Sequence, residues 1–312
     1  MTLVAAAQDA WRWQPHPEVW FLVLGVTALS LYVVRVIGPK VVPEGRPVLT
    51  RFQSVNLVLG VLTLWLASDW PLHDLGEEYL FSLHMVQHLL LSYLMPVFFL
   101  LATPPWLAHL VVPEGSASYR WLHRLSRPIF AGLLFNGVVI FTHWPKLVTA
   151  AVESGPLHYG VHVLVVASAI LMFLPVFGPF DSWRMSSPAA MAYLFAMSLL
   201  PTVPASWLIF ADGSVYDVYD TPFRLWGVSV TSDQQAAGVI MKLVGGSYLW
   251  LLIFVVFFRW AYGQQSGDPG RMADTRTPRS LEPTDDALLT YHDVQSAFEA
   301  AGSAPAEHPS PA

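Results

Sequence analysis

Apolar residues are arranged along this chain in long runs that are separated by shorter polar segments. A helix needs about 20 predominantly apolar residues to cross the hydrocarbon core of a bilayer. Seven stretches approach that length, at residues 18–37, 52–68, 79–101, 128–144, 157–177, 188–210 and 235–259. The runs at 52–68 and 128–144 are the shortest, so six spans is the alternative count. We therefore predict an all-α, polytopic membrane bundle of seven transmembrane helices.

The composition agrees with a bilayer as the solvent. The 312 residues are 54% hydrophobic and 12% charged, and their mean hydropathy is +0.48, which is far from the averages of soluble proteins. The net charge is −6, and much of the acid lies in the C-terminal tail and a few loops. No basic patch indicates a nucleic-acid partner. The expected surroundings are lipid.

The C-terminal segment changes in composition at about residue 262, where Pro, Gly, Ser, Asp and Arg replace apolar residues. Such a segment buries too little apolar surface to fold alone. We expect a seven-span membrane domain at 1–261 and a polar, largely disordered cytoplasmic tail at 262–312, with room for a short helix at 284–300. The N-terminus lacks the pattern of a cleaved signal peptide, so the first span is expected to direct insertion.

The distribution of Lys and Arg between loops predicts the orientation. Basic residues gather in the loops at 38–51 and 102–127 and in the tail, which are therefore predicted to be cytoplasmic. The loop at 69–78 carries four acids and no Lys or Arg, while 145–156 and 211–234 carry one basic residue each. These three are predicted to face outward, which places the N-terminus outside and the C-terminus in the cytoplasm.

Two predicted spans carry the same pair of histidines. His84 and His88 lie four residues apart near the start of the third span, and His158 and His162 are related in the same way in the fifth. Residues at this spacing share one face of a helix, about 6 Å apart along its axis. His143 ends the fourth span at the same predicted depth. Five histidines therefore converge near the outer side of the bundle.

A single intramembrane histidine is often an interhelical hydrogen-bond partner, but five at one depth favour a functional site. Imidazole is the commonest neutral metal ligand, so we predict a metal or metal-porphyrin site, with a proton relay or a packed polar network as alternatives. The chain has no cysteine, which leaves Met85 and Met241 as the candidate sulfur groups. Imidazole with thioether suits copper, whereas imidazole alone suits zinc equally.

Three consecutive polar residues, Asp233, Gln234 and Gln235, precede the last span. One interpretation is a helix N-cap at Ser232 or Asp233. The other is a group of side chains that supports the histidine ligands from behind. Acids of the outer loops would also raise the local concentration of cations, although such residues are commonly only solvated.

The motifs taken together resemble a known family. They are HMVQHLLLSYLMP from His84, HWP at 143–145, LHYGVH at 157–162, YDVYDTP at 216–222 and SDQQAAGVIM at 232–241. In order and spacing, over roughly residues 50–260, they are similar to the CtaG family of cytochrome c oxidase assembly factors of Bacillus and many actinobacteria.

The resemblance implies a seven-span protein of the bacterial plasma membrane that is needed to make active heme-copper oxidase, with copper delivery as its usual proposed role. The implied partners are cytochrome c oxidase subunits and an extracytoplasmic copper chaperone. The matched positions are His84, Met85, His88, His143, His158, His162, Asp233 and Gln234. Lys242 departs from the aromatic residue often found there. An unrelated single-span copper chaperone shares the family name but uses cysteines, which this chain lacks.

Three other functions are compatible with parts of this pattern. An intramembrane zinc hydrolase would use three histidines with Asp233 or an outer acid as the base, although no His-Glu-x-x-His motif is present. A b-type cytochrome would hold heme between a histidine of the third span and one of the fifth. A retinal protein would need a lysine deep in the last span, and Lys242 lies only about two turns from its start.

Overall fold

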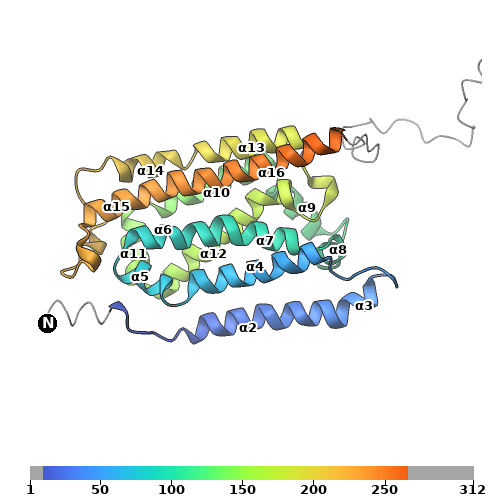
Figure 1. Ribbon diagram of the computed structural model, residues 1–312, viewed down its shortest axis with the longest axis horizontal. Helices are drawn as coiled ribbons and strands as arrows, with labels where there is room; N and C mark the ends of the chain where they lie inside the picture. Colours follow the sequence, from blue (N-terminus) through green and yellow to red (C-terminus); the bar gives the residue numbers. More distant parts are fainter. Residues whose placement is uncertain (1–9, 266–312) are drawn as a thin grey trace, which may run out of the picture. The chain divides into compact units, whose positions relative to one another are not determined.

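The computed structural model describes residues 10–265, and these residues form helices and connecting turns without a β-strand. The described residues all belong to one compact unit. Its long helices run side by side along a common direction, so that the chain passes back and forth between two ends (Figure 1). The all-α prediction is confirmed for this part of the chain. The tail from residue 266 and the helix expected at 284–300 lie outside the described residues.

The first two passes of the described chain lie along one side of the bundle (Figure 1). Helix α2 (Pro17–Tyr32) continues through a π-helical turn into α3 (Gly38–Val41), and α4 (Arg51–Ser68) returns beside it. The start of α4 is fixed by a reciprocal capping box between Thr50 and Gln53. The indole N–H groups of Trp20 and Trp65 both donate to one carboxylate oxygen of Asp69, at 2.9 and 2.7 Å. This shared acceptor ties α2 to the end of α4.

The third pass through the bundle begins with a helix that the sequence did not predict. Residues 69–78 were expected to be a loop, but α5 (Leu72–Glu78) forms there and packs against α6 (Phe81–Leu89). A π-helical turn at Leu90–Leu94 then leads into α7 (Met95–Ala102). At Gly76 a methyl group would lie only 2.9 Å from the backbone nitrogen of His84. The absence of a side chain there lets α5 approach the histidine helix closely.

The expected loop at 102–127 also contains helices. These are α8 (Pro105–Val111) and α9 (Ala117–Leu125), and α9 meets α10 (Pro128–Thr142) at a bend of 69°. Helix α10 has 15 residues and is therefore about 22 Å long, which is short for a complete span. Pro128 at its first turn and the bend before it account for its abrupt start.

The middle of the chain continues this pattern of short helices before long ones. Helix α11 (Pro145–Glu153) forms in the expected loop at 145–156 and precedes α12 (Gly155–Phe177), the fifth predicted span. The sixth is divided at Pro201 into α13 (Ser187–Leu199) and α14 (Thr202–Ile209), because proline cannot donate the backbone hydrogen bond of a continuous helix.

The last pass is the longest. Helix α15 (Val230–Val239) continues through a π-helical turn at Ile240–Val244 into α16 (Gly245–Gln265), which extends beyond the expected boundary at 261. Short 3-10 turns lie in the connections at Asp181–Trp183, Asp217–Tyr219 and Leu225–Gly227. Lys242 lies within the π-helical turn and donates a hydrogen bond to the Thr202 hydroxyl.

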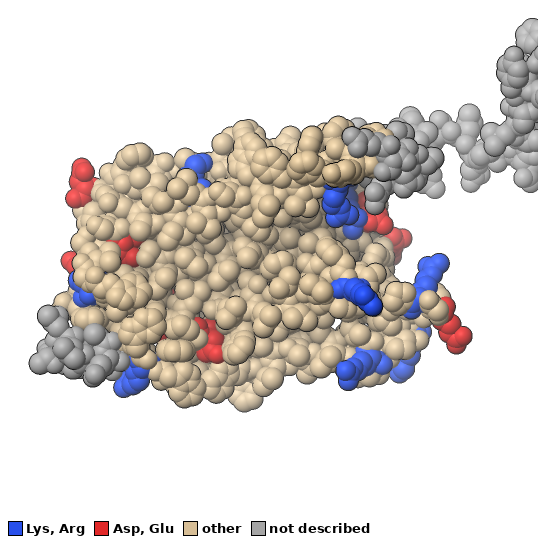
Figure 2. Space-filling view, viewed as in Figure 1, with Lys and Arg blue, Asp and Glu red and all other residues tan. Residues whose placement is uncertain are grey.

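Among residues 10–265, six helices are long and apolar enough to cross a membrane, and a seventh span results if the bent pair α9 and α10 is counted as one. Most of the Lys and Arg side chains in view gather at the end of the bundle where α16 finishes (Figure 2). The histidine pairs lie at the opposite end, at the starts of α6 and α12. Seven spans and the orientation of the termini stay predictions.

Candidate metal centre

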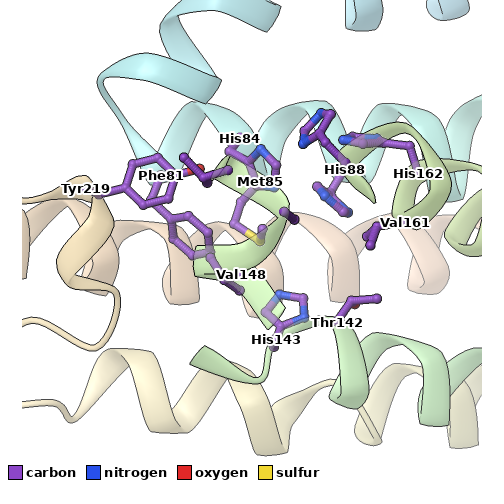
Figure 3. A pocket seen from close by; sticks show the side chains of 13 residues that line it. Phe81, His84, Met85, His88, Thr142, His143, Val148, Val161, His162 and Tyr219 are labelled. Carbon is purple, nitrogen blue, oxygen red and sulfur yellow. The ribbon is translucent and has the colours of Figure 1, made fainter. Parts of the chain in front are cut away.

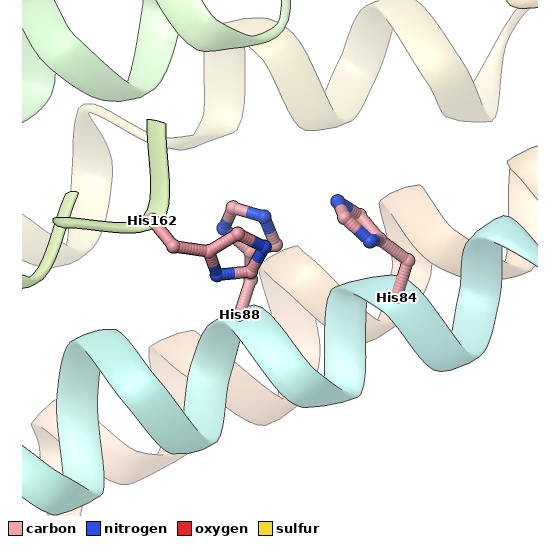
Figure 4. Close-up of side chains that lie close together, drawn as sticks. All are labelled: His84, His88 and His162. Atoms are coloured by element: carbon pink, nitrogen blue, oxygen red, sulfur yellow. The ribbon is translucent and has the colours of Figure 1, made fainter. Parts of the chain in front are cut away.

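Three histidines from two helices form a compact triad. His84 and His88 of α6 and His162 of α12 each offer a ring nitrogen, and the three nitrogens lie within 4.8 Å of one another (Figure 4). The ring centroids are 4.5 Å apart for His84 and His88 and 4.8 Å for His88 and His162. Ligand nitrogens lie about 2.0–2.1 Å from a bound zinc ion, so small side-chain rotations would bring all three onto one such ion.

His158 and Glu77 adjoin this triad, and their contacts determine which ring nitrogens are available. The Glu77 carboxylate accepts from Nδ1 of His84 at 2.8 Å and lies 3.3 Å from Nε2 of His158. A carboxylate that holds one ring nitrogen fixes the tautomer of the imidazole and makes the other nitrogen a better ligand. Glu77 therefore leaves Nε2 of His84 with its lone pair free. From the sequence, Glu77 was only one of the four acids in the expected outer loop at 69–78.

His143 reaches the same place from the end of α10. Its Nδ1 donates to the backbone carbonyl of Val139 at 2.7 Å, and because a carbonyl can only accept, Nε2 carries the lone pair. Nε2 of His143 and Nε2 of His162 are both buried without a hydrogen-bond partner among the described residues. Buried polar atoms are almost always satisfied, so two unpaired imidazole nitrogens that line one cavity favour an ion or water in that cavity.

One small cavity brings the predicted ligands together (Figure 3). Its volume is about 30 Å³, which is enough for an ion with a water molecule. The six predicted metal ligands all line it: His84, Met85, His88, His143, His158 and His162. Val148, Val161 and Tyr219 close other sides. The prediction that the histidines converge is thus met in the described structure, whereas metal binding itself is a separate question.

The two candidate methionines differ in their positions. Met85 is 3% exposed and lines the cavity, where Figure 3 shows its sulfur between the rings of His84 and His143. Met241 does not line the cavity. It belongs, together with Met85, to a buried apolar cluster that also includes Phe81 and Tyr216. Met85 is therefore placed as a possible additional ligand, and Met241 supports it only through packing.

Asp233 anchors the histidine helix rather than its own. It is 1% exposed, and its carboxylate accepts from the backbone N–H groups of Phe81 at 2.7 Å and Ser82 at 3.1 Å, and from the Ser82 hydroxyl. These groups are unpaired at the first turn of a helix, and α6 has no capping side chain of its own. Of the two interpretations of these residues, the N-cap at Ser232 or Asp233 is wrong, because Ser229 caps α15.

The two glutamines hold backbone segments in place. Gln234 accepts from the backbone N–H groups of Val215 and Tyr216, at 2.8 and 3.1 Å, and donates to the carbonyl of Tyr216 at 2.9 Å. The Tyr216 hydroxyl in turn donates to the backbone carbonyl of His143 at 2.8 Å, and burial raises the pKa of this phenol, which keeps it a donor. Gln235 donates to the carbonyl of Ala211 at 3.0 Å.

Two further histidines, which the sequence did not single out, lie beside this centre. His73 of α5 has its ring 6.0 Å from that of His158, and His16, just before α2, has its ring 5.0 Å from that of His73. Because residues 69–78 were expected to form a loop, His73 was not assigned to a helix face beside the other histidines. The available signal was the four-residue spacing between His73 and Glu77, which places them on one helix face.

The comparisons with known proteins give one family. The family model described as cytochrome c oxidase caa3 assembly factor (Caa3_CtaG) matches residues 31–262, which is most of the chain. Searches of the curated proteins and of the solved structures found no match. The matched residues include every histidine that lines the cavity. The chain therefore belongs to the family of cytochrome c oxidase caa3 assembly factors.

Proposed function

We propose that this assembly factor binds copper in the cavity lined by His84, His88 and His162 and delivers it to a subunit of cytochrome c oxidase. The observation that carries the proposal is the triad itself, whose nitrogens lie within 4.8 Å of one another in a cavity that His143 also lines. His88 and His162 come from different helices, so the tertiary packing, not one helix turn, creates the site.

The donor set favours copper over harder cations. Imidazole nitrogen and thioether sulfur suit copper, while carboxylate and carbonyl oxygens suit magnesium, calcium or manganese. The cavity offers five imidazoles and the sulfur of Met85, and its lining contains no carboxylate. A bound ion would also satisfy the two buried imidazole nitrogens that have no partner among the described residues.

Delivery requires that the ion can leave. The triad lies near one end of the bundle, and the rings of His84 and His158 are slightly exposed, with 12% and 11% of each side chain accessible. Because more imidazoles line the cavity than a tetrahedral site needs, ligands can be exchanged one at a time while the ion is passed on. We infer no chemical turnover, and we place the site at the outer face of the bacterial plasma membrane.

The alternative zinc hydrolase needs a carboxylate base beside the ion. Asp233, the expected base, is occupied by three donors at the start of α6. Glu77 already accepts from His84 and neighbours His158. The heme alternative needs space for a porphyrin, which a cavity of about 30 Å³ does not offer. These contacts favour an ion-transfer site over either alternative.

Metal analysis of purified protein tests the proposal. We expect the wild type to retain copper after dialysis and the double variant His84→Ala, His88→Ala to retain less of it, with a matching loss of oxidase activity in cells. His109→Ala is the matched control, because this half-exposed histidine lies in α8, away from the cavity. Equal copper in wild type and double variant, or stoichiometric zinc with lipid hydrolysis, would overturn the proposal.

A further inference from the structure

A second group of metal-ligating side chains lies beside the triad without belonging to it. His16, His73 and Asp74 each offer one ligand atom, and these atoms lie within 4.8 Å of one another. His16 Nε2 and an Asp74 carboxylate oxygen are 2.6 Å apart, and the His16 and His73 rings are 5.0 Å apart. None of these three residues is a ligand of the triad, so both groups can be occupied together.

The geometry of this outer group leaves one acceptor without a donor. Asp74 is 5% exposed, and its Oδ2 is buried without a hydrogen-bond partner among the described residues. An unpaired carboxylate oxygen in a buried position is unfavourable unless a cation or a donor compensates it. The Gln87 amide nitrogen donates to Nδ1 of His73 at 3.0 Å and so orients that ring. One carboxylate oxygen of this group is therefore available to a cation.

His16 is held in place although it precedes the first helix. Its Nδ1 lies 3.3 Å from a carboxylate oxygen of Glu18. Burial of the ring by itself would lower the pKa of His16, but the carboxylates of Asp74 and Glu18 outweigh burial and raise that pKa. Glu18 also accepts from the Tyr159 hydroxyl of α12 at 3.3 Å. His16 lies outside residues 31–262, which match the family model. This ligand therefore comes from a part of the chain that the family comparison does not cover.

A third group bridges the outer one and the triad. His73, Glu77 and His158 also lie within 4.8 Å of one another by their ligand atoms. His73 belongs to the outer group as well, Glu77 contacts His84, and the rings of His158 and His162 are 4.4 Å apart. An ion can thus move from His16 to the triad by exchanging one ligand at a time. No step requires it to leave all protein ligands.

We propose that His16, His73 and Asp74 form a second cation site that receives copper from outside, and that His73, Glu77 and His158 pass the ion inward to the triad. The transfer is a ligand exchange without a change of oxidation state, and the proton shared by His16 and Asp74 is released when the ion binds. The outer group contains the carboxylate of Asp74, whereas the cavity of the triad contains the thioether of Met85. The available ligand atoms therefore become softer from the outer group to the triad. The direction of transfer rests on the proposed function, whereas the existence of the site does not.

Counting ions tests the site. Protein in detergent is dialysed anaerobically against copper(I) in a competing buffer, and bound copper is measured per chain. We expect two ions for the wild type, one for His16→Gln, Asp74→Asn, and one for His88→Ala, His162→Ala. Glu78→Gln is the matched control, because it removes one negative charge from α5 at a residue that belongs to none of the three groups. This variant should bind two ions, as the wild type does.

The variants separate the two proposals. If His16→Gln, Asp74→Asn binds as much copper as the wild type, the outer site is refuted while the triad is unaffected. If His88→Ala, His162→Ala loses nothing but the outer variant loses an ion, the triad is refuted and the outer site stands. The single variant His16→Ala, at a position before the first helix, repeats the test without altering α5.

The rate at which the triad fills tests the transfer step. The triad of His16→Gln, Asp74→Asn should still bind one ion, but at subsaturating copper it should fill at least several times more slowly than in the wild type. Glu78→Gln should fill at the wild-type rate. Equal filling rates in all three proteins would show that copper reaches the triad by another route and would overturn the inward transfer.

Discussion

At the scale of single residues, the candidate centre depends on which ring nitrogens carry protons. Glu77 accepts from Nδ1 of His84, and the Val139 carbonyl accepts from Nδ1 of His143. Both contacts leave Nε2 as the free ligand atom, and both histidines line the same cavity. The metal affinity of such a site is therefore set by residues that do not bind the ion as well as by those that do.

Glu77→Gln tests this role at the residue scale. The amide can still accept from His84 but lacks the charge that makes the imidazole a stronger ligand, so copper affinity should fall about tenfold to hundredfold. Competition with a copper chelator measures the change. Glu78→Gln removes the same charge from an exposed neighbour and should leave the affinity unchanged. Equal effects of the two substitutions would mean that only the net charge of this end matters.

At the scale of helices, the position of α6 depends on α15, which is far from it in sequence. Asp233 of α15 satisfies the two backbone N–H groups at the start of α6. Asp233→Ala leaves them unpaired in a buried position, and unfolding should become easier by about 1 to 3 kcal/mol. Thermal unfolding in detergent measures this loss, and copper affinity should fall with it.

Asp217→Ala is the control for that experiment, since Asp217 is an exposed aspartate in the connection before α15. Its unfolding temperature should match that of the wild type. An Asp233→Ala protein that unfolds at the same temperature would contradict the capping role, and one that is destabilised but binds copper normally would separate helix capping from the metal site.

The close contact of α5 with α6 gives a second prediction at this scale. A methyl group at Gly76 would lie 2.9 Å from the His84 nitrogen and 3.1 Å from its Cα, and backbone atoms cannot move aside cheaply. Gly76→Ala should push α5 away from α6, separate Glu77 from His84 and lower copper affinity. The cost in stability should be about 1 to 3 kcal/mol.

Gly160→Ala is the matched control for Gly76→Ala. Gly160 lies in α12 between His158 and His162, and a methyl group there would have nothing within 4 Å. Alanine also favours helix more than glycine does, so this variant should be at least as stable as the wild type. If both variants bound copper like the wild type, the approach of α5 would not matter for the site.

At the scale of the whole molecule, the predicted orientation places the histidines at the outer face. The chain has no cysteine, so a single introduced thiol can be labelled without background. A membrane-impermeant reagent should label Glu153→Cys at the end of α11 in intact cells, and should label Ser118→Cys in α9 only after the membrane is opened. Both residues are exposed. The reverse pattern would place the cavity at the cytoplasmic face and contradict delivery from outside.

The sequence by itself determined the helical, membrane-type architecture and the two histidine pairs. Apolar runs of span length and the spacing of His84 with His88, and of His158 with His162, are local features that a helix converts directly into a face. The family motifs belong to the same level, and the family model confirms them.

Only the tertiary structure decided which residues surround those histidines. A short polar segment such as 69–78 has too few residues for a clear helical period, so α5, His73 and the role of Glu77 were not predicted. The same holds for Asp233, whose partners Phe81 and Ser82 lie some 150 positions away. Side-chain type and local spacing fix a helix face, but contacts between distant helices depend on how the whole bundle packs, and those contacts made the site.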